Sequence, residues 1–174
     1  GQNVLVVHRV TNNVTFLDVD TRAVTHTVQV GNFPLDVAVT PNGQKAVVPN
    51  TLDHTVSIIN IATHTVVATV PVTGQQPFAV AITPDSQFAV VALINDASNS
   101  GFSIINLNTN SETLSFPSTS QGVIGGFFTP EGGISGPILT QFALTPDGNT
   151  IMLPDRGGGA VNLDSRATGA LVNS

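Results

Sequence analysis

The sequence predicts an all-β fold, a β-propeller of four-stranded antiparallel blades, on three observations. First, one motif occurs three times, as VAVTPNG at 37–43, VAITPDS at 80–86 and FALTPDG at 142–148, and its first two copies start 43 residues apart. Second, the segments between the copies are rich in Val, Ile and Thr and alternate apolar with polar residues, as half-buried strands do. Third, four such segments in a repeat of about 40–45 residues are typical of a propeller blade, and no window has sustained helical periodicity.

Each copy of the motif also carries a turn signal, because Pro41, Pro84 and Pro146 are each followed by Asn or Asp and then by Gly or Ser. Further repeats read SIINIA at 57–62 and SIINLN at 103–108. Together with the segment HTVVATVPV, these motifs resemble the YVTN repeat family of bacterial and archaeal β-propellers over nearly the whole chain, apart from about 121–140. The chain departs from the family pattern in having no Tyr and in reading Val-Pro-Asn where the family has Val-Thr-Asn.

The resemblance implies the order of strands within a blade, from strand A at the centre to strand D at the rim. In this order, a first blade at 3–30 has no strand A, a second covers 34–72 and a third covers 77–118. An insertion follows at 120–139, and a fourth blade at 140–174 has a short segment in place of strand D. The single propeller domain would hold about 3.75 blades, whereas closed propellers have about four to eight. We therefore expect part of a larger propeller, or a ring completed by self-association or by a protein partner.

Composition excludes several classes of function. The 174 residues suit one domain, and a net charge of -6 without any Lys/Arg cluster excludes nucleic acid as a partner. Cys is absent, which excludes disulfides, thiolate metal sites and a Cys nucleophile, and no apolar run approaches the roughly 20 residues of a membrane span. Only 9% of the residues are charged. With the resemblance, this favours an extracytoplasmic location (secreted, periplasmic or cell surface), the signal peptide not being present in this sequence.

Two insertions interrupt the repeat. The segment from the third-blade strand C to the fourth-blade strand A spans 39 residues instead of 23, and the extra residues lie within 120–139, which includes Phe127 and Phe128. The B–C loop of the third blade has 3 extra residues within 94–101, which includes Asp96. B–C and D–A loops emerge on the same face of a propeller, so both insertions are predicted to crowd one mouth of the central channel. Such deviations indicate a binding site, although loops also tolerate neutral insertions.

Polar residues at equivalent strand ends are the first candidates for ligand binding. His8, Asn50 and Asp155 end B strands at the same position of the repeat, and Arg9 and Arg156 follow two of them. They are predicted to face the same mouth and to form a polar cluster around a ligand. The alternative is structural, because polar side chains at strand ends often bond loop backbone groups.

Two further candidates are Asp36, which begins a strand A and is expected to project toward the channel, and His54 in a B–C loop. His26 and His64 lie in or beside outer strands and are expected to be solvated surface. No two histidines have the close spacing of a metal motif, and no catalytic constellation is evident. The sequence therefore assigns no catalytic residue, metal or cofactor.

Three functions are consistent with these features. The leading hypothesis is a non-catalytic extracytoplasmic propeller that serves as a binding or assembly module, with its site at the channel mouth formed by B–C and D–A loops. The resemblance also implies an enzyme as an alternative, either a lactonase-like hydrolase or a quinoprotein-type dehydrogenase subunit. A third hypothesis is a structural subunit whose open sheet edges build a ring or fibre.

Overall fold

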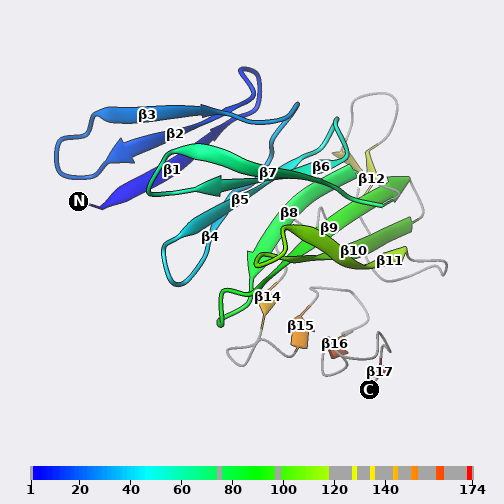
Figure 1. Cartoon of the computed structure of the whole chain (residues 1–174). Helices are drawn as coiled ribbons and strands as arrows, with labels where there is room; N and C mark the ends of the chain where they lie inside the picture. Colours follow the sequence, from blue (N-terminus) through cyan, green and yellow to red (C-terminus); the bar gives the residue numbers. More distant parts are fainter. Residues whose placement is uncertain are drawn as a thin grey trace.

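The chain folds into antiparallel β-sheets that follow one another along the sequence (Figure 1). The structure is a computed structural model that describes residues 2–73, 76–96 and 99–117, together with six short strand segments that lie between 127 and 173. Within these residues there are one three-stranded sheet, three four-stranded sheets and one two-stranded sheet. The four larger sheets are the successive blades, and they confirm the predicted all-β propeller of about 3.75 blades.

The second and third blades each contain four strands, in the order A to D across the sheet. The second consists of β4 (Ala38–Val39), β5 (Lys45–Asn50), β6 (Thr55–Asn60) and β7 (Thr65–Pro71). The third consists of β8 (Gln76–Ile82), β9 (Phe88–Asp96), β10 (Asn99–Asn106) and β11 (Ser111–Pro117). Every neighbouring pair is antiparallel, as hairpin connections of a few residues require.

The first blade has three strands, and the described part of the fourth consists of short strand segments. The first consists of β1 (Asn3–His8), β2 (Asn13–Asp18) and β3 (Val24–Gln29), with β1 at the edge of the sheet. The fourth consists of β14 (Ala143–Leu144), β15 (Thr150–Met152), β16 (Ala160–Asn162) and β17 (Val172–Asn173). The insertion contributes a hairpin of its own, in which β12 (Phe127–Phe128) pairs with β13 (Ile134–Ser135).

The C–D turns of three blades share one construction. Asp18, Asn60 and Asn106 occupy the same position, and the side-chain oxygen of each accepts the N–H groups of the residues two and three positions later. Short acceptors of this kind hold turns against their own backbone. The Thr21 N–H bond is also the main cause that holds the pKa of the Asp18 carboxyl below its ordinary value.

The A–B turns repeat just as closely, which explains the recurrent Thr-Pro-Asn/Asp motif. The Thr40 hydroxyl donates to Asn42 Oδ1 (2.7 Å), and it also accepts the N–H of Lys45 (3.0 Å). Gly43 follows with φ 70°, a left-handed conformation that glycine adopts at little cost. Thr83 plays the part of Thr40 in the third blade, where it accepts the N–H of Phe88 (3.0 Å).

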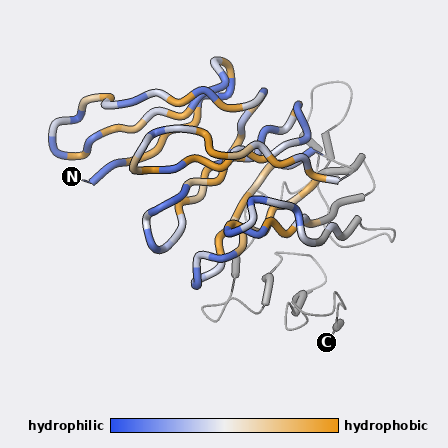
Figure 2. The backbone as a smooth tube through the Cα atoms, in the orientation of Figure 1, coloured by the Kyte–Doolittle hydropathy of each residue, from blue (hydrophilic) through white to orange (hydrophobic). Residues whose placement is uncertain are grey.

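Apolar side chains fill the junctions between blades, and Figure 2 shows the strands mostly hydrophobic and the turns mostly hydrophilic. The junction of the first and second blades buries Val14, Phe16, Val28, Ala46, Val48 and Ile59. The junction of the second and third blades buries Val47, Val56, Ile58, Val91, Leu93 and Ile105, among others. Successive side chains point to opposite faces of a strand, so the neighbours Val47 and Val48 enter different junctions. In the described part of the chain, no helix is long and apolar enough to cross a membrane.

Candidate functional site

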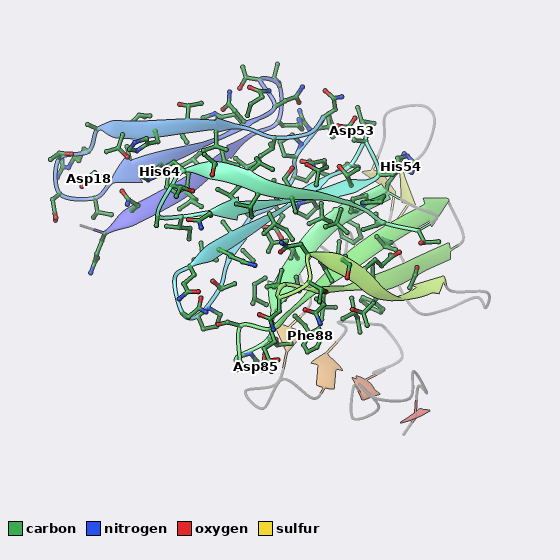
Figure 3. All side chains as sticks on the ribbon, viewed as in Figure 1. Asp18, Asp53, His54, His64, Asp85 and Phe88 are labelled. Atoms are coloured by element: carbon green, nitrogen blue, oxygen red, sulfur yellow. The ribbon has the colours of Figure 1, made fainter. Side chains whose placement is uncertain are left out.

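The candidate residues of the first two blades lie on one face of the molecule. We call it the loop face and define it as residues 8–12 and 50–54, which are the two B–C turns with the strand-end residue before each, together with the D–A connection 30–37. Figure 3 labels Asp53 and His54 on this face.

Asn50 is a structural residue at the centre of the loop face. Its side chain is fully buried; its Oδ1 accepts the N–H of Gly31 (3.1 Å), and its Nδ2 donates to the hydroxyls of Thr55 (3.0 Å) and Ser57 (2.9 Å). Gly31 allows this close approach, since a Cβ there would lie 2.7 Å from both the Asn50 Cγ and the Asp53 Oδ2. The amide of Asn50 is therefore occupied by the protein itself, as the structural alternative expected.

Asp53, which the sequence did not single out, fastens the D–A connection to the B–C turn. Its two carboxylate oxygens accept the backbone N–H and the side-chain amide of Asn32, both at 2.7 Å. These two bonds, the backbone bond first, hold the pKa of the Asp53 carboxyl below its ordinary value. The Asn32 side chain in turn accepts the Asn12 amide (2.8 Å), so all three segments of the loop face are linked.

The two predicted histidines have separate surroundings. The exposed His8 ring contacts the Thr15 hydroxyl on β2 through Nε2, at 2.9 Å. His54 is exposed and adopts a left-handed backbone with φ 56°, and its C=O accepts the N–H of Val72 (3.0 Å). No contact between His8 and His54 is recorded in the part of the chain that the structure describes.

Arg9 lies over an aromatic ring. Its guanidinium carbon is 4.9 Å from the centre of the Phe33 ring, which is within the range of cation–π attraction. Phe33 has φ 59°, an unusual conformation for a bulky residue. Asn12 Oδ1 accepts its N–H (3.0 Å) and its C=O accepts the N–H of Thr51 (3.2 Å), so both neighbouring turns hold this backbone in place.

Asp36 connects two blades. One carboxylate oxygen accepts the N–H of Val37 (2.8 Å), and the other accepts the N–H of Val80 on β8 (3.0 Å). Val80 belongs to the inner strand of the third blade, so the carboxylate satisfies a backbone donor of that strand. This bond accounts for Asp36, where the third blade has Ala79, and it occupies the carboxylate within the fold.

The short insertion of the third blade lengthens a hairpin. β9 and β10 extend beyond the strand ends of the second blade, and Asp96 pairs with Asn99 at the tip after a register shift. In the long insertion, the backbones of Phe127 and Phe128 pair with β13. Their side chains, like the residues Asp155 and Arg156, lie outside the described part of the structure.

Sequence reasoning missed a carboxylate at the rim. Glu112 on β11 accepts the N–H of Thr73 (3.0 Å) and the hydroxyl of the buried Ser103 (2.6 Å). Glu112 and Thr73 also line a hollow of about 370 Å³ between the outer strands β7 and β11. The signal was a charged residue where the other two blades have Val66 and Val24.

Sequence reasoning also separated two histidines that the fold brings together. The rings of His26 on β3 and His64 in the next blade are stacked, with centroids 3.6 Å apart and planes 4° from parallel, and Phe16 meets His64 edge-on at 4.9 Å. Burial, and then the neighbouring His26, hold the pKa of His64 below its ordinary value. A metal ion lies in the plane of each imidazole that binds it, so two rings stacked one above the other, in separate parallel planes, cannot share one ion. Among the described residues, no group of three or more His, Asp or Glu is placed to hold a metal.

Comparison with known proteins identifies the architecture. The sequence matches no protein-family model and no curated protein. Among solved structures it is similar to Kuenenia stuttgartiensis hydrazine synthase, with 22% identity and a TM-score of 0.74 over 99% of this chain and 47% of that one.

Two further solved structures have the same arrangement. A functionally unknown protein from Desulfotomaculum acetoxidans is 19% identical with a TM-score of 0.66, over 99% of this chain and 65% of that one. A putative 6-phosphogluconolactonase from Bacteroides uniformis is 13% identical with a TM-score of 0.70, over 100% of this chain and 50% of that one. This chain thus spans less than two thirds of the length of each. At these identities the similarity shows the fold, a β-propeller-like stack of blades.

Proposed function

We propose that this chain is a non-catalytic propeller of the YVTN-repeat type that serves as a binding or assembly module in an extracytoplasmic location. Assembly would take place at the first blade, whose inner strand is not among the described residues and would come from the rest of a larger propeller, from another chain or from a second copy. Binding would take place on the loop face, at the mouth formed by B–C and D–A loops. The open edge of β1 is the single observation that carries the proposal.

The edge of β1 has no partner among the described residues, since the sheet order is β1-β2-β3. The N–H of Val19 donates to the C=O of Gln2 (3.0 Å). This bond shows which residues of β1 direct their backbone N–H and C=O groups toward β2, because in an antiparallel pair every second residue does so. The backbone groups of Val4 and Val6 therefore bond β2, whereas those of Leu5, and of the residues two positions before and after it, point to the open edge. Unpaired backbone groups of this kind are a template for adding a strand.

The second blade shows how a strand equivalent to β1 pairs with an inner strand. β5 corresponds to β1 residue for residue, so that Val47 corresponds to Leu5 and Pro49 to Val7. Val47 pairs with Ala38 of the inner strand β4. A strand of the same kind, with Val-Ala-Val before a Thr-Pro turn, is therefore the occupant expected at β1.

A labelled peptide of residues 34–44, the inner strand of the second blade, tests the proposal by fluorescence anisotropy. We expect it to bind the chain, and we expect Leu5→Pro to weaken binding about tenfold or more because it removes an edge N–H. Val7→Pro is the matched control, because the second blade has Pro49 at that position beside its own inner strand. Light scattering on a sizing column shows whether a second copy occupies the edge instead.

Failure of the peptide to bind, with a monomeric chain at the same concentration, would contradict the proposal. Equal binding by wild type and Leu5→Pro would contradict it too, because the peptide would then lie elsewhere. Thermal unfolding of both proline variants checks that each of them is folded.

A propeller enzyme, either a lactonase-like hydrolase or a quinoprotein-type dehydrogenase subunit, is a second candidate. The structural similarity to a putative 6-phosphogluconolactonase favours the hydrolase. A phosphorylated gluconolactone is the substrate to assay, and loss of turnover in His8→Ala would support a site on the loop face. No turnover of this lactone by the purified chain would remove the hydrolase. A structural subunit of a ring or fibre would use the same β1 edge, and light scattering would reveal it as a larger particle.

A further inference from the structure

The loop face exposes apolar side chains at the tips of its turns. Val10 and Leu52 occupy the same position in the two four-residue B–C turns, and they are 85% and 58% exposed, with Leu35 of the D–A connection 40% exposed. The N–H of Leu52 donates to the C=O of Asn32 (3.3 Å), which places this turn against the D–A connection. Apolar side chains gathered in one region mark interaction sites more often than single ones do.

Arg9 supplies a fixed positive charge beside these side chains. Its guanidinium lies over the Phe33 ring, and no carboxylate partner for it is recorded among the described residues. The Asp53 carboxylate of the neighbouring B–C turn is already engaged, since it binds Asn32. The guanidinium thus keeps its hydrogen-bond donors available on a chain of net charge -6.

Phe33 is held in a conformation that only its surroundings explain. A φ of 59° is costly for an aromatic residue, and the bonds from Asn12 and Thr51 maintain it. Backbone strain of this kind concentrates at functional sites. Its consequence here is that the ring is positioned beneath Arg9, so the charged group and its aromatic support are arranged before any partner arrives.

We infer that Arg9, Phe33, Val10 and Leu52 form a docking surface for an extended protein segment that carries a carboxylate beside apolar side chains. This inference rests on the proposed binding function and specifies the chemical groups that the partner would carry. The carboxylate would accept the guanidinium donors, and the apolar side chains would cover the turn tips. A protein segment fits better than a small molecule, because these side chains stand out from turns, whereas small molecules are enclosed by pockets. Arg and aromatic residues are also enriched at protein interfaces.

Selection of a random dodecapeptide phage library on the immobilised chain tests this inference. We expect enriched peptides with Asp or Glu next to apolar residues. In anisotropy measurements with a labelled enriched peptide, we expect Arg9→Ala to weaken binding about tenfold and Arg9→Lys to weaken it less. Arg22→Ala is the matched control, because it removes the same charge from an exposed C–D turn outside the loop face and should leave binding unchanged.

Each other outcome is decisive. Enriched peptides that bind Arg9→Ala as well as wild type would overturn the docking surface but would leave the chain a binding module. No enrichment would also overturn it, while the peptide assay on the β1 edge decides the proposed function separately. Thermal unfolding midpoints of the variants exclude misfolding as the cause of lost binding.

Discussion

At the scale of single residues, the turns of this propeller are defined by short side-chain acceptors and by a left-handed residue that follows them. Arg22, His64 and Asn110 occupy the same position of three C–D turns and have φ of 57°, 54° and 52°. Asn and His are among the non-glycine residues that adopt this conformation most often, whereas Arg is strained in it. The repeat therefore keeps a backbone shape that its residues do not equally favour.

Arg22→Gly should raise the free energy of unfolding by about 0.5–1 kcal/mol, because glycine adopts positive φ without a Cβ clash. Urea unfolding followed by circular dichroism measures the change. Arg22→Ala is the control, since it removes the same charge and side chain but keeps the Cβ, and it should give no gain. Equal stabilisation by both variants would show that the effect comes from charge and would contradict the argument from backbone strain.

At the scale of elements, the strands and turns could be predicted because they repeat, whereas contacts between blades could not. The Thr-Pro-Asn/Asp turns and the alternation of Val and Ile are local patterns, and in the second and third blades the structure has strands and turns where they occur. Asp36 and Val80 are 44 residues apart in sequence, and Glu112 and Thr73 are 39 apart. Nothing in the local pattern joins such pairs, because their contact depends on how one blade packs on the next.

Glu112→Ala should lower the free energy of unfolding by about 1–3 kcal/mol, because it removes the acceptor of the Thr73 N–H and of the buried Ser103 hydroxyl. Glu112→Gln keeps one carbonyl oxygen at the site and should cost less. Urea unfolding of the two variants measures the order. A loss below about 0.5 kcal/mol in Glu112→Ala would mean that water replaces the carboxylate at no cost.

At the scale of the whole molecule, part of the candidate site could also be predicted. The repeat placed His8 and Asn50 at equivalent strand ends. It could not predict which of the two side chains the fold would bury and hydrogen-bond to its own groups. Asn50 is fully buried at the end of β5, whereas His8 is exposed at the end of β1. The role of Phe33 was beyond reach for the same reason, since its conformation depends on Asn12 and Thr51 in two different turns.

The junction of the first two blades should make stability depend on pH. The fold holds the pKa of His64 below the ordinary value of 6.5, through burial and through the charge of the stacked His26. A depressed histidine pKa means that the folded chain binds fewer protons than the unfolded chain. Its stabilisation is therefore complete above pH 6.5 and is lost as the pH falls from there through the folded pKa.

Urea unfolding between pH 7.5 and 5.5 measures this dependence, in a range where the lowered carboxyl pKa values of Asp18 and Asp53 contribute nothing. We expect wild type to lose stability toward pH 5.5, and we expect His64→Asn to lose less, because Asn suits the left-handed turn and does not titrate. His54→Asn is the matched control, since His54 has the same backbone conformation outside the ring stack. An unchanged slope in His64→Asn would show that the stacked histidines do not couple the two blades to pH, because the proton released on folding would then come from another group.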